Sequence, residues 1–242
     1  MCLDLREDVV YTFGMGTLNP AHIKFATIAA DTALFTIRDG MLVVRAIRVM
    51  RPPHFPDNAG LPGGLIAPKE TAEEAARRHV TAKTSIATSG VYFEQLYTFS
   101  DIKRDPRGRV VAVAYLALVP WEKLSDAERE DGDESYWLPV SRARALAYDH
   151  DEILNTALVR LKSRLRYTTL IGKLMPSEFT LTELERTYES ILGKDLDKRN
   201  FRKKILKLKV LKELSRKRSG GRSRPARLYC FASRTVQEIE VI

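Results

Sequence analysis

Residues 179–231 carry the clearest local signals in the chain, and they read FTLTELERTYESILGKDLDKRNFRKKILKLKVLKELSRKRSGGRSRPARLYCF. Thr180 and Glu183 have the spacing of a capping box, in which the threonine hydroxyl accepts from the Glu183 backbone N–H and the glutamate reaches back. The helix that they start is predicted to end at Gly193, because glycine readily adopts the left-handed conformation after a helix. A second helix is predicted to begin near Asp197.

A basic hairpin is predicted to follow the two helices. Leu211 to Leu214 indicates a strand, Ser219-Gly220-Gly221 a flexible turn, and Arg227 to Phe231 a return strand. Helix, turn, helix and hairpin in this order are typical of a winged helix-turn-helix, which places its second helix in the major groove of DNA. The sequence therefore predicts double-stranded DNA as a partner.

The positive charge of the chain is concentrated in its second part. The net charge of all 242 residues is +9, but residues 1–140 carry −3 and residues 141–242 carry +12. Residues 198–227 hold 14 basic side chains and one acid, Glu213. So much like charge on one short stretch repels itself unless a partner neutralises it, which favours a polyanion over an ordinary solvated face.

Two groups of side chains are predicted to contact DNA in different ways. The exposed face of the second helix is predicted to read base edges, and the hairpin is predicted to neutralise phosphates. The helix group is Lys198, Arg199, Asn200, Arg202 and Lys203, and the hairpin group is Arg218, Arg222 and Arg224. Asn200 can pair with adenine through its amide, but a local capping contact explains this residue equally well.

Strands dominate the prediction for the first part of the chain. A hairpin is predicted from residues 27–38 and 41–49, joined by Asp39-Gly40, a pair that supplies the positive φ angles of a tight turn. The other predicted elements are a helix over 71–83, strands over 90–99 and 109–119, a helix over 149–166, and loops over 51–64 and 122–134.

The segment after this hairpin resembles the signature of the Nudix family. Residues 61–64 (Leu-Pro-Gly-Gly), Glu70 and Arg78 keep the spacing of that signature. Its later glutamates are replaced by His79, Ala82 and Lys83. Nudix hydrolases use these carboxylates to hold a divalent metal, and hard cations such as Mg²⁺ need oxygen ligands. We therefore expect a cleft without catalytic residues and without a bound metal.

Further pieces resemble the Nudix-related transcriptional regulators of bacterial NAD metabolism. They are residues 97–99, 104–109, 146–150, 167–169, 179–188, 196–204 and 220–226. The resemblance covers about residues 26–232. It implies an α+β chain, in which a Nudix-like α/β/α sandwich with a mixed sheet precedes a C-terminal winged helix-turn-helix domain. It also implies a homodimer that represses genes of NAD biosynthesis or salvage in response to an adenine nucleotide, usually ADP-ribose.

The resemblance to this family does not decide which nucleotide is the effector or which residues contact it. Residues 57–60 (Asp-Asn-Ala-Gly) replace the aromatic side chains usual before residues 61–64, so NAD and ATP are alternatives to ADP-ribose, as in an alphaproteobacterial branch. Arginine favours bidentate contacts with phosphate, and glycine lets backbone approach it. The candidate effector-binding residues are Arg45, Arg48, Arg51, Gly63, Gly64, Glu70, Arg78 and Arg107.

The expected organisation is a lead-in over 1–25, a Nudix-like nucleotide-sensing domain over 26–148, a connecting helix over 149–166 and a winged helix-turn-helix domain over 167–242. Two other functions remain: an active Nudix hydrolase acting on ADP-ribose or a related dinucleotide, supported by the retained Glu70 and Arg78, and a nucleic-acid-processing enzyme. No apolar run approaches the roughly 18 residues of a membrane span. With an acidic first segment unlike a secretory signal, we expect a cytoplasmic, nucleoid-associated protein without a membrane partner.

Overall fold

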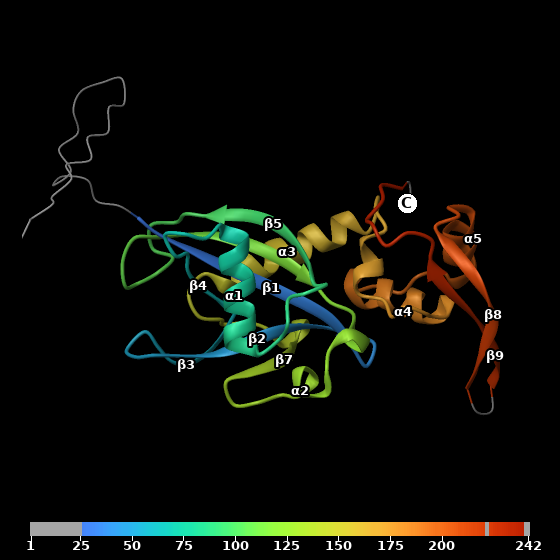
Figure 1. The fold of residues 1–242 in the computed structure, drawn as a ribbon, viewed down its shortest axis with the longest axis horizontal. Helices are drawn as coiled ribbons and strands as arrows, with labels where there is room; N and C mark the ends of the chain where they lie inside the picture. Colours follow the sequence, from blue (N-terminus) through green and yellow to red (C-terminus); the bar gives the residue numbers. More distant parts are fainter. Residues whose placement is uncertain (1–25, 221–222, 240–242) are drawn as a thin grey trace, which may run out of the picture.

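A computed structural model describes residues 26–220 and 223–239 of the chain (Figure 1). The predicted lead-in over 1–25 and the side chain of Arg222 lie outside the described residues. A domain built around a sheet occupies one end of the molecule, and the winged helix occupies the other end. Within the described residues, no helix combines the length and the apolar character that crossing a membrane requires.

A mixed sheet forms the centre of the first domain. Its strands are β1 (Thr27–Arg38), β2 (Met41–Arg51), β3 (Phe55–Gly60), β4 (Gly63–Leu65), β5 (Tyr92–Phe99), β6 (Val110–Leu118) and β7 (Ser135–Pro139). The main order is β3-β2-β1-β6-β5, with β4 paired to β1 and β7 paired to β2. Strands β1 and β6 run parallel and the other pairs are antiparallel. The expected hairpin is confirmed, with positive φ at Asp39 and Gly40.

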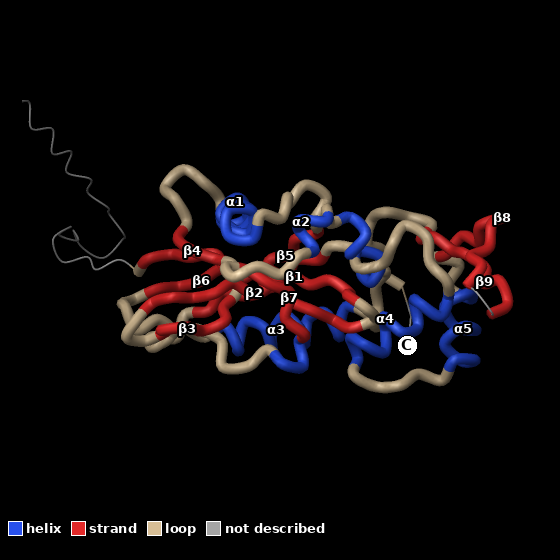
Figure 2. Tube along the Cα trace, turned by 90° about the horizontal axis from the view of Figure 1, so that it is seen from below, coloured by secondary structure: helices blue, strands red, loops and turns tan. Residues whose placement is uncertain are grey.

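One long helix covers each face of this sheet (Figure 2). Helix α1 (Ala72–Thr84) buries Ala75, Ala76 and Val80 on one side. Helix α3 (His150–Arg164) lies on the opposite side and buries an aliphatic stripe that includes Ile153 and Leu161. The stripes follow the 3.6-residue period that the sequence shows, so both helices appear where they were predicted. The expected α/β/α sandwich is therefore present.

Two predicted loops contain regular structure. The segment 51–64 was expected to be a loop because of its proline and glycine content, but it contains β3 and β4. Strand β3 lies at an edge of the sheet, where proline is tolerated because the outer N–H groups need no partner. Within 122–134 lies the short helix α2 (Asp126–Arg129), and the following β7 was not predicted.

The winged helix consists of α4 (Leu181–Leu192), α5 (Lys198–Lys207), β8 (Leu211–Gly220) and β9 (Ser223–Phe231). The capping box is confirmed: the Glu183 N–H donates to the Thr180 hydroxyl at 3.2 Å, and the Thr180 N–H donates to the Glu183 carboxylate at 2.7 Å. Gly193 ends α4 with a φ of 71°. Strand β8 is longer than the predicted 211–214, because its basic outer half pairs with β9.

The two domains share one hydrophobic core. A single cluster of buried side chains extends from Phe35 in β1 through Leu161 in α3 to Tyr188 in α4 and Tyr229 in β9. A hydrogen bond also joins the domains, because the backbone N–H of Leu42 donates to the Ser190 hydroxyl at 2.8 Å. The winged helix is therefore packed against the sheet domain rather than tethered to it.

Candidate functional site

A cleft of about 760 Å³ opens where β1, β2 and β4 meet the last turn of α1 and the loop between β5 and β6. The basic side chains that line it are Arg48, Arg51, Lys83, Arg104, Arg107 and Arg109, and the acidic ones are Asp31, Asp105 and Glu134. The six cations outnumber the three carboxylates, so the cleft favours an anion.

Arg104 is the best-buried cation of the cleft, with 3% of its side chain exposed. Its guanidinium donates to both carboxylate oxygens of Asp149 at 2.7 Å and to Asp31 at 3.1 Å. Burial alone would lower the pKa of Arg104, but hydrogen bonding to Asp149 and the charge of Asp31 raise it. This triad joins β1 to the start of α3 and holds the cleft wall in one arrangement.

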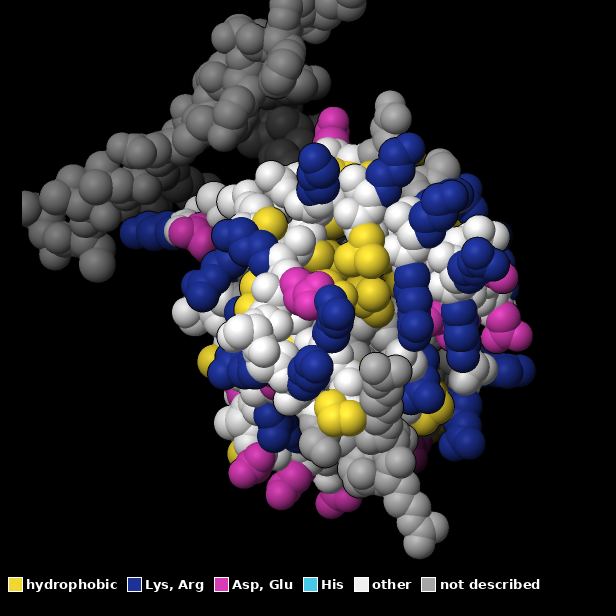
Figure 3. Space-filling model, turned by 90° about the vertical axis from the view of Figure 1, so that its right-hand side faces the viewer, with side chains coloured by type: hydrophobic (Ala, Val, Ile, Leu, Met, Phe, Trp, Pro, Cys, Tyr) yellow, Lys and Arg dark blue, Asp and Glu magenta, His cyan; other side chains and the backbone are white. Residues whose placement is uncertain are grey.

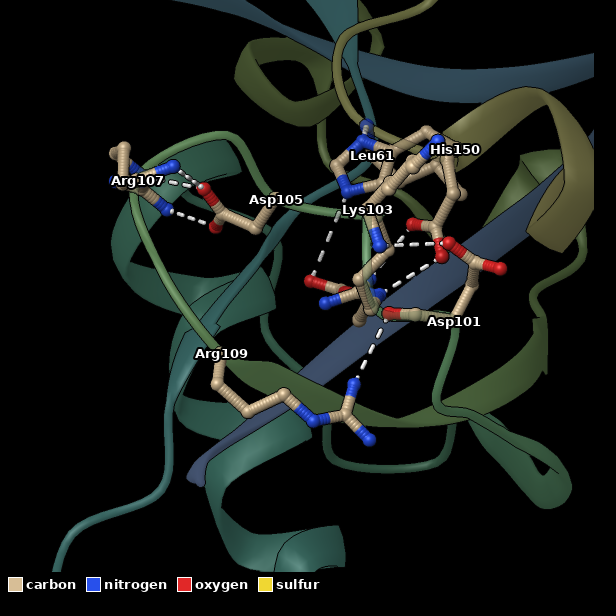
Figure 4. A network of polar contacts seen from close by, with 10 residues as sticks. Leu61, Asp101, Lys103, Asp105, Arg107, Arg109 and His150 are labelled. Atoms are coloured by element: carbon tan, nitrogen blue, oxygen red, sulfur yellow. Dashed lines mark hydrogen bonds and ion pairs between the residues drawn. The ribbon is translucent and has the colours of Figure 1, made fainter. Parts of the chain in front are cut away.

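His150 fixes the neighbouring backbone (Figure 4). Its Nδ1 lies 2.9 Å from the backbone N–H of Leu61, and its Nε2 lies 3.8 Å from a carboxylate oxygen of Asp31. Complete burial lowers the pKa of His150, so the ring is neutral and Nδ1 can accept from Leu61. The ring proton then sits on Nε2, facing Asp31.

Tyr148 presents an aromatic ring to the cleft. Its backbone has a φ of 58°, which is uncommon for a residue other than glycine. The ring packs on Phe55 with centroids 4.5 Å apart, and the Arg107 guanidinium lies 5.0 Å from its centroid. Arg107 is oriented by Asp105, with contacts of 2.6 and 2.9 Å. A ring beside a guanidinium offers a flat surface for a planar base and a cation for a phosphate.

Two adjacent glycines let β4 lie against the floor of the cleft. A Cβ atom on Gly63 would stand 2.0 Å from a carboxylate oxygen of Asp31. A Cβ atom on Gly64 would stand 2.6 Å from the ring of His79. The close approach that required glycine is therefore between parts of the protein itself, and both glycines still line the cleft.

Glu70 and Arg78 form a pair beside the cleft. Arg78 donates to both carboxylate oxygens of Glu70 and to the Leu65 carbonyl. The hydrogen bonds from Arg78, with one from the Ala67 N–H, lower the pKa of Glu70 to about 2. Both residues keep the predicted spacing, but they do not line the cleft and are occupied by each other.

The two carboxylates in the first turn of α1 also have structural partners. Glu73 accepts from Arg77 four residues later, and Glu74 completes a capping box at the helix start. The His79 ring contacts the Leu65 carbonyl at 2.9 Å. In the part of the chain that the structure describes, no three His, Cys, Asp or Glu side chains are grouped to hold a metal ion. These residues do not fit the Mg²⁺ site of a Nudix hydrolase.

Arg45 does not reach the cleft, contrary to the sequence-based expectation. Its buried guanidinium donates to the Ser135 hydroxyl at 2.8 Å and to the Glu130 carbonyl at 3.1 Å, and it lies over Trp137. In a strand, successive side chains point to opposite faces, so Arg45 and Arg48 diverge. Arg48 lines the cleft and pairs with the Asp57 carboxylate at 2.7 and 2.9 Å.

At the winged-helix end of the molecule, most of the charged side chains are Lys and Arg (Figure 3). All five predicted reading residues are exposed on α5: Lys198, Arg199, Asn200, Arg202 and Lys203. Asp197 caps the helix by accepting from the Asn200 backbone N–H at 2.7 Å, so the capping role belongs to Asp197. Arg202 reaches back to the Thr182 hydroxyl at 3.0 Å.

The hairpin contacts α4 through its arginines. Arg218 donates to the Glu183 carboxylate at 2.5 Å and to the Glu178 carbonyl at 3.0 Å. Arg216 pairs with the Glu178 carboxylate. Arg224 lies on β9, and its side chain is outside the described part of the structure, as is the whole of Arg222.

Comparison with known proteins agrees with this two-part architecture. Residues 27–157 match the NUDIX domain family, and residues 171–231 match the NrtR DNA-binding winged helix domain. The chain is 35% identical to an ADPR responsive transcriptional repressor of Acinetobacter baylyi over 211 residues, which cover 85% of this chain and 82% of that protein. The chain belongs to the NrtR family.

Solved NrtR structures share the fold. Shewanella oneidensis NrtR in complex with a 27mer DNA is 32% identical, with a TM-score of 0.73, over 84% of this chain and 93% of that one. The NUDIX domain of the same protein, in complex with ADP ribose, is 30% identical, with a TM-score of 0.51, over 60% of this chain and 94% of that one. The predicted fold, a Nudix domain followed by a winged helix, is confirmed.

Sequence reasoning missed several cleft residues of this NrtR chain. The sequence patterns do not single out Asp31, Arg104, Tyr148 or His150 as site residues, and they mark Lys83 only as the replacement of a carboxylate. A signal for three of them existed, because residues 104–109 and 146–150 are among the stretches that resemble the family. Asp31 lies in none of these stretches, and its partners Arg104 and His150 are distant in the sequence.

Proposed function

We propose that this NrtR chain is a transcriptional repressor of NAD biosynthesis or salvage genes, which binds operator DNA through α5 and the β8–β9 hairpin and responds to ADP-ribose held in the cleft. The observation that carries this proposal is an electropositive cleft in a domain that shares its hydrophobic core with a basic winged helix. The family members with bound DNA and bound ADP ribose support it. NAD and ATP remain alternative effectors.

Within the cleft, we assign three roles. Arg48, Arg51 and Arg107 contact the phosphates, and Tyr148 stacks on the base or lies beside the ribose. Gly63 and Gly64 form the adjoining backbone wall. The Glu70–Arg78 pair acts at the rim by holding the β4–α1 connection.

Calorimetry on the full chain tests the effector. ADP-ribose, NAD and ATP are titrated separately, and a gel shift with DNA from upstream of the chain's own gene is repeated with each nucleotide. We expect one nucleotide to bind and to change the gel shift. If none of the three binds, the cleft is not a nucleotide sensor. If the chain fails to shift the DNA at any protein concentration, the repressor assignment fails.

We also propose that the chain is not an enzyme. Glu70 is paired with Arg78, Glu73 with Arg77, and Glu74 belongs to the capping box, so these carboxylates are not available to hold Mg²⁺. ADP-ribose, NAD and ATP should survive incubation with the pure protein and Mg²⁺ or Mn²⁺. Turnover on the order of 1 per second or faster would instead establish the alternative function, an active Nudix hydrolase.

We propose that the chain acts as a homodimer. One winged helix contacts a single half-site, and pairing supplies the affinity and register that a specific repressor needs. The operator should then be palindromic, with half-site centres roughly 34–36 Å apart, about one helical turn, or a multiple of this. Sedimentation of the protein–DNA complex together with footprinting measures both quantities. A single protected half-site bound by one chain would contradict the dimer.

A further inference from the structure

Lys83, in the last turn of α1, lines the cleft and has no role in the function proposed above. Its ammonium donates a hydrogen bond to the Gly63 carbonyl at the floor of the cleft. Its surroundings are mainly cationic, with Arg51 and Arg107 nearby and Asp31 as the opposing charge. A lysine held among arginines needs an explanation, because like charges repel.

We infer that Lys83 is a built-in cation that takes the place of a divalent metal, so that the cleft binds the pyrophosphate of its nucleotide without Mg²⁺. The inference rests on the proposed function of the cleft and specifies the chemistry of its ligand, a diphosphate. The α1 residues that a metal would need are replaced or paired, while Lys83 supplies positive charge from the same helix.

The other charges of the cleft leave Lys83 available for an anion. Asp31 is shared with Arg104, and Asp105 is paired with Arg107. Among the described residues, neither Lys83 nor Arg51 forms a salt bridge with a carboxylate. An ammonium has three donors, and the bond to Gly63 uses one of them, so two remain for phosphate oxygens.

The position of this ammonium is set before any ligand arrives. Gly63 lies so close to Asp31 that no Cβ fits between them, which fixes the carbonyl that accepts from Lys83. Helix α1 is anchored by its buried Ala76 and Val80. Loss of hydration is the main reason that the pKa of Lys83 is lowered, and the repulsion of Arg51 and Arg107 adds to it. A bound diphosphate would relieve that repulsion, which is the behaviour expected of a phosphate site.

The first experiment compares metal conditions. ADP-ribose and inorganic pyrophosphate are titrated into the full wild-type chain by calorimetry, once with EDTA and once with Mg²⁺. We expect the affinity for ADP-ribose to agree within about twofold between the two conditions. Binding that appears only with Mg²⁺ would overturn the inference and leave the proposed function intact. Absence of binding in both conditions would instead contradict the assignment of ADP-ribose as the effector, which belongs to the proposed function.

The second experiment removes the ammonium. Lys83→Met keeps the length of the side chain, and we expect it to weaken ADP-ribose binding in EDTA by about 10- to 100-fold, the effect of charge-assisted hydrogen bonds to one group. Lys83→Arg should recover part of the affinity. Lys69→Met is the matched control, because Lys69 is exposed and does not line the cleft. Unchanged thermal midpoint and DNA binding show that Lys83→Met is folded, and full affinity in that folded variant would refute the inference.

Discussion

The cleft and the winged helix both carry excess positive charge, but they hold it in different ways. In the cleft, Arg104 is buried between two carboxylates, and Arg107 is oriented by Asp105. On α5, the side chains of Lys198 and Arg199 are exposed, and no salt bridge holds them within the described residues. Charges that are fixed in advance increase the affinity for a small ligand, because less entropy is lost on binding. Binding to a DNA backbone depends instead on exposed charges that displace counterions from the phosphates.

The largest expected effect tests the fixed charges. Arg104→Met leaves Asp31 and Asp149 buried without their cation, so we expect it to lower the free energy of unfolding by about 3–5 kcal/mol. Arg199→Met is the matched control in the winged helix, and its effect should stay within about 0.5 kcal/mol. Denaturant unfolding at neutral pH measures both values. An equal decrease in the free energy of unfolding of the two variants would show that the charges of the cleft are not held more firmly than those of α5.

The reading role of α5 predicts the next largest effect. Arg199→Ala or Asn200→Ala should cost about 1–3 kcal/mol at the operator and relax its sequence preference, because a base-edge contact is lost. Footprint titrations on operator and unrelated DNA separate the two kinds of loss. If specific and non-specific binding fall equally, α5 is not the reading element.

The hairpin should behave differently from α5. Arg218→Ala is expected to weaken binding to all DNA sequences alike and to reduce the slope of log affinity against log salt by about one, because one phosphate contact is removed. Arg218 first has to leave Glu183, so Glu183→Gln is a useful companion variant and should strengthen binding slightly. A loss confined to the operator sequence would assign Arg218 to base reading instead. Arg222→Ala and Arg224→Ala should follow the Arg218 pattern.

The smallest expected effect on stability comes from the Glu70–Arg78 pair at the cleft rim. The pKa of Glu70 is lowered to about 2 by Arg78 and by the Ala67 N–H. Its contribution to stability is therefore complete above the unfolded value of 4.5 and is lost as the pH falls through about 2. NMR titration of Glu70 measures the shift, and Arg78→Met should return the pKa toward 4.5. An unchanged pKa in that variant would show that Arg78 is not its cause.

Local signals account for the parts of the fold that the sequence predicted correctly. The Asp39-Gly40 turn and the capping box at Thr180 act over two to four residues, so they can be read from the chain alone. Strand β7 escaped prediction because it exists only by pairing with β2, about 90 residues earlier. Strand β3 was hidden by its proline and glycine residues, which an edge position accommodates.

The difference between local signals and long-range contacts also explains which site residues the sequence predicted. Gly63 and Gly64 lie in a recognisable motif, Arg48 was a candidate because arginine favours phosphate, and the structure places all three in the cleft. Arg104 and Asp31 form a hydrogen bond although they are 73 residues apart in the sequence, and no local pattern predicts such a contact. The choice of Arg45 ignored the alternation of side chains along a strand, which the sequence did contain.

The shared core has a consequence for how the protein unfolds. Because Phe35, Leu161 and Tyr188 belong to one buried cluster, neither domain can open without exposing apolar surface of the other. Heating should then give one cooperative transition for the whole chain. Ligand occupancy of the cleft would slow the exchange of amide hydrogens in α4 as well as in β1, although α4 touches no ligand. Binding of a nucleotide in the cleft would in this way raise the free energy of unfolding of the winged helix as well.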